Sequence, residues 1–219
     1  MIRGVISRLK PATLLSALKA LSEQPSPGPA PAFSHVHICR VLLLIGDEGP
    51  IGRIELSRKV MLGEGATRTI IRHLMQAKLV SVISNGCTLT KRGAALYGRL
   101  RAKLSKVAFV DAGQLSLDKF NAALSVREGA HRVRLGIEQR DAAVRAGATG
   151  ACTLVIKSRR YVMPMLDTSE SILKSDDTLV RELNGLLKPG NRDAVTIASA
   201  SERALAEHGA FAAALTLLD

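Results

Sequence analysis

The stretch from residue 53 to residue 92 constrains the fold more than any other, because it contains a complete series of short elements. Residues 53–62 carry apolar side chains one helical turn apart, which predicts a short amphipathic helix. Residues 63–65 (Gly-Glu-Gly) predict a sharp turn, because glycine tolerates a positive φ. A second helix is predicted over residues 66–78, where apolar side chains recur at helical spacing. Its predicted inward positions are Ile70, Ile71, Leu74 and Met75.

A β-hairpin is predicted after the second helix. Residues 79–83 and 87–90 have the composition of strands, and residues 85–86 (Asn-Gly) favour a tight turn, because a type I′ turn needs a positive φ at both central positions. Thr90 can cap a further helix that begins at Lys91. Helix, turn, helix, hairpin and helix in this order predict a winged helix-turn-helix.

The second helix is the candidate DNA-contacting helix. A helix that enters the major groove must be apolar behind and carry hydrogen-bond donors in front. The polar side chains of its other face are Thr67, Arg68, Thr69, Arg72, His73 and Gln76. Further candidates in neighbouring elements are Arg53, Arg58, Lys59, Asn85, Lys91 and Arg92. The alternative is a small helical domain whose polar face is only solvated.

The distribution of charge favours DNA. Residues 1–106 hold 17 Lys and Arg against 5 Asp and Glu, whereas residues 107–219 hold 14 of each, so the whole net charge of +12 lies in the first half. A polyanionic partner explains this asymmetry, because phosphate contacts supply much of the affinity for nucleic acid. No aromatic residue lies between His35 and Leu96, which favours duplex DNA over single strands or RNA, whose bases usually stack on aromatic rings.

Two segments precede the winged helix. Residues 11–22 predict a helix whose leucine stripe must dock, either on its own domain or on a second subunit. Residues 24–32 are rich in proline and predict a stiff linker. Ser34 can cap the first helix of the winged domain, which we expect to run to Ile45. Its predicted inward residues are Ile38, Val41, Leu42 and Ile45.

The second half of the chain alternates predicted strands and helices, which indicates a mixed α/β domain. The strands are expected at residues 120–126, 132–135, 153–157, 160–163 and 193–198. The helices are expected at residues 137–146, ended by Gly147, at residues 176–187, capped by Ser175, and at residues 201–217, capped by a box of Ser199 and Glu202. In the last helix Ala206, Ala210 and Ala214 with Gly209 indicate close packing, on the sheet or at a dimer seam.

The fold class expected is therefore α+β or α/β. Residues 1–33 form an N-terminal helix and linker, and residues 34–106 form a winged helix-turn-helix DNA-binding domain. Residues 107–219 form an α/β domain for effector binding or dimerisation.

One candidate ligand site lies in the second half. Glu138, Arg140 and Asp141 crowd the first turns of a predicted helix, and Ser199 and Ser201 lie where a strand meets a helix N-terminus, which can bind an anion. Together they predict a pocket for a small anionic effector. The alternative, which we favour, is that the serines cap the helix and Arg140 pairs with Asp141 or Glu138.

Other kinds of site find little support. Cys39, Cys87 and Cys152 are too far apart for a disulfide framework or a zinc pattern, and His35, His37 and Cys39 make only a weak metal cluster. We recognise neither a signal peptide, a membrane span, a cofactor motif nor a catalytic constellation. We expect a soluble cytoplasmic protein that is not an enzyme and that carries no metal or cofactor.

Several runs of sequence resemble archaeal winged-helix transcriptional regulators, in which the module precedes an α/β domain of unknown function. In the first half these runs are Gly28–Phe33, Ile51–Arg53, Gly63–Gly65, Arg68–Arg72 and Leu89–Gly93. In the second half they are Gly136–Asp141 and the strand from Asp193 to Ala200. The resemblance implies a DNA-binding regulator and supplies no ligand.

The sequence thus predicts a transcriptional regulator that binds double-stranded DNA, as a homodimer, and that has a sensing or dimerising second domain. The alternatives are a metabolite-binding protein or enzyme with a basic scaffold, and a chromatin protein without sequence preference.

Overall fold

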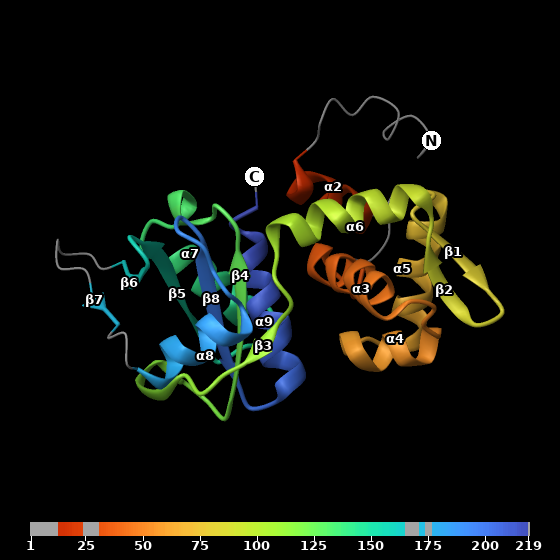
Figure 1. Cartoon of the computed structure of the whole chain (residues 1–219). Helices are drawn as coiled ribbons and strands as arrows, with labels where there is room; N and C mark the ends of the chain where they lie inside the picture. Colours follow the sequence, from red (N-terminus) through yellow and green to blue (C-terminus); the bar gives the residue numbers. More distant parts are fainter. Residues whose placement is uncertain (1–12, 24–30, 165–170, 174–176, 219) are drawn as a thin grey trace. The chain divides into compact units, whose positions relative to one another are not determined.

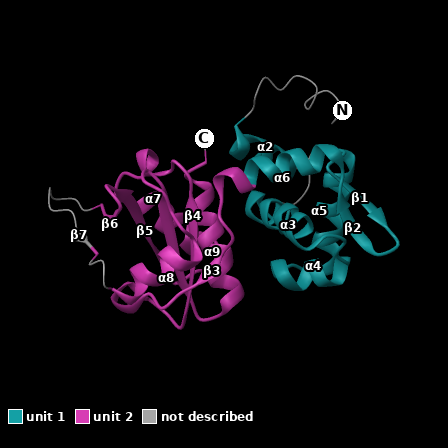
Figure 2. Ribbon diagram, viewed as in Figure 1, with its two compact units in different colours: residues 1–100, 219 teal, residues 101–218 magenta. Residues whose placement is uncertain are grey.

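The chain forms two compact units, which divide between Leu100 and Arg101 (Figures 1 and 2). The computed structural model describes residues 13–23, 31–164, 171–173 and 177–218. Most of the predicted proline-rich linker and the predicted Ser175 cap lie outside the described residues.

The N-terminal unit is a winged helix-turn-helix, which confirms the predicted fold of this part. Its elements are α2 (Leu14–Ser22), α3 (His35–Glu48), α4 (Arg53–Val60), α5 (Glu64–Gln76), β1 (Val80–Ile83), β2 (Gly86–Leu89) and α6 (Lys91–Lys103), the last of which runs past the division between the units. Ser34 caps α3 as predicted, and the His37 side chain accepts the Ser34 backbone N–H in return, which completes a capping box.

Helix α2 docks on its own unit. Leu14 and Leu18 are buried, and α2 packs against α3 and α5. Of the two alternatives for the leucine stripe, docking within one domain is therefore the one that the structure shows. The helix needs this partner, because nine residues alone are too short to remain helical in water.

The turn between α4 and α5 differs from the prediction. Met61, with φ of 56°, ends α4 in the left-handed conformation, whereas Gly63 has φ of −61° and is the N-cap of α5. Gly65 lies within α5. The expected positive φ in the Gly63–Gly65 turn is therefore wrong, and a methionine adopts the left-handed conformation two residues earlier.

The hairpin lies where it was predicted, but its turn is displaced by one residue. Ile83 pairs with Gly86, so Ser84 and Asn85 are the central residues, and only Gly86 has a positive φ, of 126°. A Cβ on Gly86 would lie 2.6 Å from the carbonyl carbon and oxygen of Ile51. Glycine is needed here because the backbone of Ile51 approaches the hairpin closely and bonds to Cys87.

The C-terminal unit is built on a six-stranded sheet in the order β3-β4-β8-β5-β6-β7, and every pairing is antiparallel. The strands are β3 (Ala108–Phe109), β4 (Phe120–Val126), β5 (Gly150–Lys157), β6 (Arg160–Met163), β7 (Ser171–Ile172) and β8 (Ala194–Ala200). The α-helices are α7 (Ile137–Arg145), α8 (Thr178–Leu186) and α9 (Arg203–Leu215), and short 3₁₀ helices span Gly113–Leu115 and Ala130–Arg132.

Three local predictions for this unit are wrong. Residues 132–135 form no strand, since a 3₁₀ turn ends at Arg132. Helix α8 begins at Thr178, and the Asp177 carboxylate caps it by accepting the Leu179 N–H. Ser199 lies within β8 and cannot take part in a capping box for α9.

Helices cover both faces of the sheet. Helices α7 and α9 pack against β4, β5 and β8, and the Thr196 hydroxyl approaches the Ala210 carbonyl oxygen within 3.3 Å. The neighbouring Val195 and Ile197 point to the opposite face, where they join a cluster with α8. A Cβ on Gly209 would lie 2.6 Å from the Cβ of Ala148, so α9 lies directly on its neighbours. The small residues of α9 thus serve sheet packing, one of the two alternatives.

Candidate nucleic-acid interface

Helix α5 has one buried and one exposed face. Ile70, Ile71 and Leu74 are at most 7% exposed and join the core of the unit. Arg68 and Arg72 lie four residues apart on the exposed side, so they share a face. No described carboxylate forms an ion pair with either arginine. The helix therefore presents two free cations to solvent.

Two positions of α5 differ from the predicted faces. Thr67 is fully buried, and its hydroxyl donates to the Gly63 carbonyl oxygen at 3.2 Å, so its place in the DNA-contacting set is wrong. Met75 is 46% exposed and lies beside the exposed Gln76, not in the core. Helical spacing in fact puts Thr67 on the buried face, because it lies three and four residues before Ile70 and Ile71, whereas Met75 lies at the border between the two faces.

His73 has an internal partner. Its Nδ1 lies 3.1 Å from the carbonyl oxygen of Leu21 in α2, and its ring packs edge-on against Phe33 at 5.8 Å between centroids. Since a carbonyl oxygen can only accept, Nδ1 carries the proton. His73 therefore ties α2 to α5, and its contact with DNA stays a prediction. Thr69 is half-buried and donates to the Gly65 carbonyl oxygen at 3.1 Å.

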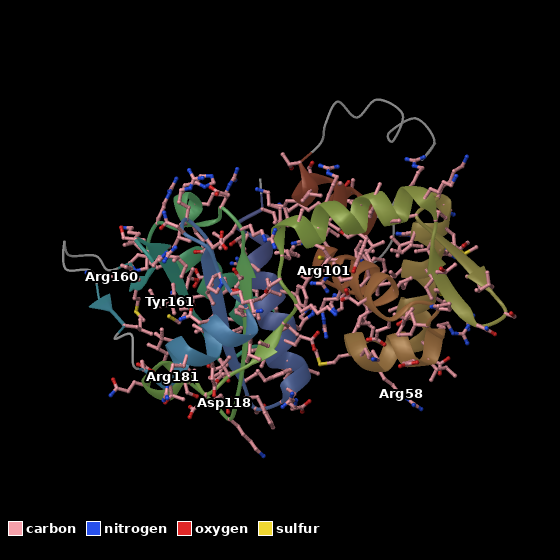
Figure 3. The ribbon with its side chains drawn as sticks, viewed as in Figure 1. Arg58, Arg101, Asp118, Arg160, Tyr161 and Arg181 are labelled. Atoms are coloured by element: carbon pink, nitrogen blue, oxygen red, sulfur yellow. The ribbon has the colours of Figure 1, made fainter. Side chains whose placement is uncertain are left out.

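The cations of α4 differ in their partners. Lys59 contacts Glu48 at 2.8 Å and Glu55 at 3.6 Å, and the hydrogen bond to Glu48 raises the pKa of the lysine. Arg53 contacts Glu64, at the start of α5, at 3.3 Å. Arg58 is exposed, forms no ion pair among the described residues, and projects away from α4 (Figure 3). Of these three candidates, Arg58 is the one whose charge is unneutralised.

The tip of the wing is uncharged, whereas the end nearest α6 carries positive charge. No charged residue lies between Leu79 and Thr90, and Val82 and Ile83 near the tip are 53% and 47% exposed. Asn85 is exposed at the turn, and Lys91 and Arg92 are exposed where α6 begins. The exposed apolar pair was not anticipated, because the alternation of β1 predicts only one outward side chain.

The base of the wing is fixed by Thr90. Its hydroxyl donates to the Lys78 carbonyl oxygen at 2.7 Å and accepts the Gly93 N–H at 3.1 Å, as the predicted cap requires. Lys78 has φ of 58°, so a left-handed residue links α5 to β1. The cations at the start of α6 are thereby held at a fixed position relative to α5.

The histidines of α3 are kept neutral by their surroundings. Burial, followed by the charge of Arg40 and by His35, lowers the pKa of His37 to about 4. Burial and Lys19 also lower the pKa of His35. Within the described part of the chain no group of three His, Cys, Asp or Glu side chains could hold a metal ion.

One residue of the predicted effector pocket in the C-terminal unit cannot contact a ligand. Ser199 is 1% exposed, donates to the Asn121 side-chain oxygen at 2.6 Å and accepts the Leu117 N–H, so it cannot reach a ligand. Arg140 pairs with Asp141 at 3.0 Å, which is the alternative that we favoured for this arginine.

The other two candidates of that pocket remain on the surface. Glu138 lies 4.0 Å from Arg134, and Ser201 is exposed between β8 and α9. Among the helices that the structure describes, none is sufficiently long and apolar to span a membrane.

Comparisons with known families match the two units separately. Residues 38–104 match the CggR N-terminal DNA binding domain, and residues 117–217 match a domain of unknown function, DUF4443. The N-terminal unit is therefore similar to a DNA-binding domain and the C-terminal unit to a domain of unknown function, which confirms the two-part resemblance inferred from the sequence. A comparison with curated proteins found no significant match.

Two solved structures are similar to this chain. A hypothetical protein, PH0730 from Pyrococcus horikoshii OT3, is 26% identical over 82% of this chain and 90% of its own, with a TM-score of 0.60. The MarR family protein Rv2887 of Mycobacterium tuberculosis is 26% identical over 41% of this chain and 63% of its own, with a TM-score of 0.30.

Proposed function

We propose that this chain, in which a CggR-type DNA-binding domain precedes a DUF4443 domain, is a transcription regulator that binds duplex DNA through helix α5. The observation that carries the proposal is the exposed pair Arg68 and Arg72 on a helix that is buried on its other side. An arginine can donate two hydrogen bonds to the major-groove edge of guanine. The match of residues 38–104 to a DNA-binding family supports this role.

The exposed cations of the N-terminal unit have different roles in this proposal. Arg68 lies nearer the N-terminus of α5, the part of such a helix that usually contacts base edges, so we assign it to sequence discrimination. Arg58, Lys91 and Arg92 are exposed on other elements, and we assign them to phosphate. Phosphate contacts orient the protein on the duplex but carry no sequence information.

The test begins with selection of bound fragments from random duplex DNA. Arg68→Ala should then lose about 1–3 kcal/mol more affinity for the selected site than for a scrambled duplex, because a base contact is lost. Lys91→Ala is the matched control, and it should weaken both duplexes alike and lower the salt slope by about one. Equal losses for Arg68→Ala on both duplexes would support a chromatin protein without sequence preference.

Dimerisation through the C-terminal unit is part of the proposal. Ile137 and Val144 lie seven residues apart on α7, share one face, and are 44% and 48% exposed. A second copy that covered this face would remove both side chains from water. Val144→Glu should therefore convert a dimer into a monomer in sedimentation velocity, with Arg145→Glu on a neighbouring exposed position as control. A wild-type chain that sediments as a monomer would exclude this part of the proposal.

A further inference from the structure

Three loops of the C-terminal unit meet at one end of its sheet. Val126, the last residue of β4, pairs with Ala194 at the start of β8, and Ala194 also pairs with Val155 near the end of β5. Lys157 pairs with Arg160 across the β5–β6 turn. The segments that leave or reach these strand ends, residues 127–134, 157–160 and 188–193, therefore lie side by side. We call them the basic loop cluster.

A buried carboxylate organises two of these loops. Asp193 is 8% exposed, and its two oxygens accept the Glu128 N–H at 2.9 Å and the Gly190 N–H at 2.7 Å. The Asn191 side chain accepts the Ser158 N–H at 2.9 Å, which adds the third loop. These bonds fix the loops relative to one another, because a short side chain of one loop accepts a backbone N–H of each of the other two.

The bond pattern continues through the backbone of Arg192. Its N–H donates to the Ile156 carbonyl oxygen at 2.9 Å, and its carbonyl oxygen accepts the Ala130 N–H at 3.0 Å. The Arg192 guanidinium also contacts Glu128 at 2.9 Å. The three loops thus form one connected surface.

Positive charge is concentrated on this surface. The basic loop cluster holds eight of the 14 Lys and Arg residues of the segment 107–219, and all eight are exposed. It holds only two of the 14 acidic residues of that segment, Glu128 and Asp193, and both already have partners. Arg160 belongs to the cluster, whereas Asp118 precedes β4 at the opposite end of the sheet (Figure 3).

The backbone of the cluster adopts a conformation that is uncommon outside glycine. All the positive-φ residues other than glycine that the structure describes in this unit lie in it: Glu128, Ser158, Arg159, Lys188 and Arg192. Such residues persist where the surrounding hydrogen bonds hold them, and they are frequent at functional sites. In two of the three loops the positive-φ residues include basic ones, namely Arg159 in one loop and Lys188 and Arg192 in the other, and all three are exposed.

We propose that the basic loop cluster is a second DNA-binding surface, which contacts the phosphate backbone of duplex DNA. Six of its eight cations are arginines, whose planar guanidinium matches phosphate oxygens. It contains no Phe, Tyr or Trp, so it lacks the larger rings on which single-strand and RNA binding surfaces usually stack bases. The proposal rests on the proposed function, in which the N-terminal unit binds the same duplex.

The test uses the full chain with three substitutions in the cluster, Arg159→Gln, Arg160→Gln and Lys188→Gln. None of these side chains makes the bonds that join the loops. If each contacts one phosphate, the slope of log affinity against log salt should become shallower by about 2–3, since each contact contributes about 0.9. Affinity for the selected site and for scrambled duplex should fall by the same factor.

The matched control removes three exposed charges outside the cluster, with Lys119→Gln, Arg145→Gln and Arg181→Gln. Its salt slope should equal that of the wild type. Thermal denaturation checks the fold of both triple variants. If the cluster variant is less stable, Arg160→Gln and Lys188→Gln singly should each lower the slope by about 0.9.

The outcomes separate this inference from the proposed function. If the salt slope of the cluster variant equals that of the wild type, the inference is overturned. The proposed function still stands in that case if Arg68→Ala loses its preference for the selected site. A reduced slope together with equal losses for Arg68→Ala supports the inference and overturns sequence-specific regulation. If an RNA duplex competes for the cluster-dependent binding more strongly than DNA does, the assignment to DNA is overturned.

Discussion

The two units of this protein carry positive charge on their surfaces in different ways. In the first half of the chain, which contains the N-terminal unit, the excess is visible in the sequence, because residues 1–106 hold 17 basic and 5 acidic residues. The second half has no net charge, yet eight of its basic residues gather at one end of a sheet. The net charge of a segment therefore does not describe the surface that the segment forms.

The two surfaces also depend on different forces. Helix α5 is held in place by apolar side chains behind it, such as Ile70 and Leu74, which are fully buried. The basic loop cluster is held by hydrogen bonds to a buried carboxylate, that of Asp193. The stability of the α5 surface should thus be sensitive to the loss of apolar side-chain volume, and that of the basic loop cluster to the loss of a single hydrogen-bond acceptor.

The largest effect is expected behind α5. Leu74→Ala should lower the free energy of unfolding of the N-terminal unit by about 2–5 kcal/mol, because it leaves a cavity in the core. Tyr97 and Tyr161 are the chain's two tyrosines, one in each unit. Urea unfolding followed by tyrosine fluorescence in a Tyr161→Phe background reports the N-terminal unit alone.

The neighbouring residue provides the control for this prediction. Met75→Ala should change the same free energy by no more than about 0.5 kcal/mol, because the side chain is 46% exposed. Equal losses at Leu74 and Met75 would contradict the assignment of faces on α5.

The next effect concerns the support of the basic loop cluster. Asp193→Ala removes a carboxylate that accepts two backbone N–H groups, and it should cost the C-terminal unit about 3 kcal/mol. Tyr161 fluorescence in a Tyr97→Phe background measures this loss. Asp141→Ala, which removes only an exposed carboxylate on α7, should change stability by less than about 1 kcal/mol. If Asp193→Ala lowered the stability as little as Asp141→Ala does, the hydrogen bonds of the Asp193 side chain would not be the interactions that stabilise the loops.

A pH effect should distinguish the N-terminal unit. The folded-state pKa of His37, about 4, lies below its unfolded value of 6.5, so the unfolded chain binds more protons between these values. The stability that neutral His37 contributes is therefore fully present above pH 6.5 and is lost as the pH falls toward 4. Since the side chain is partly exposed, we expect a loss of about 1–2 kcal/mol.

Glutamine at this position tests the pH effect without removing the cap. His37→Gln can still accept the Ser34 N–H, as in an ordinary capping box, but it does not titrate. Urea unfolding of the variant at pH 7 and pH 4.5 should show a smaller difference than that of the wild type. An unchanged difference would assign the acid sensitivity to other groups.

The smallest of these effects is expected at the base of the wing. Thr90→Ala removes the N-cap of α6 and should cost about 1 kcal/mol, because the Gly93 N–H loses its acceptor. Thr90→Ser keeps a hydroxyl and should restore most of the loss. A serine variant as unstable as the alanine variant would show that the methyl group, and not the cap, stabilises this corner.

Local patterns predicted most of the elements. Ser34 and Thr90 were recognised as caps because a cap depends on a few consecutive residues. The turns were less predictable. Left-handed φ falls on Met61 and Gly86, and not on Gly63 or Asn85, because neighbouring strands and helices decide where the chain must bend.

The two faces of α5 were predicted only in part. Arg68 and Arg72 lie where helical spacing puts them, but Thr67 and His73 are taken up by contacts within the unit. The partner of His73 is Leu21, on the far side of the proline-rich segment. Spacing within one helix contains no information about such a distant neighbour.

The sequence by itself determined the winged helix-turn-helix and the basic character of the first half. Both depend on short-range properties, namely apolar spacing, capping and the count of charged residues. Only the tertiary structure decided where Ser199 lies and that residues 127–134, 157–160 and 188–193 form one surface. The physical reason is strand pairing, because the register of an antiparallel sheet brings together loops that lie far apart in the chain.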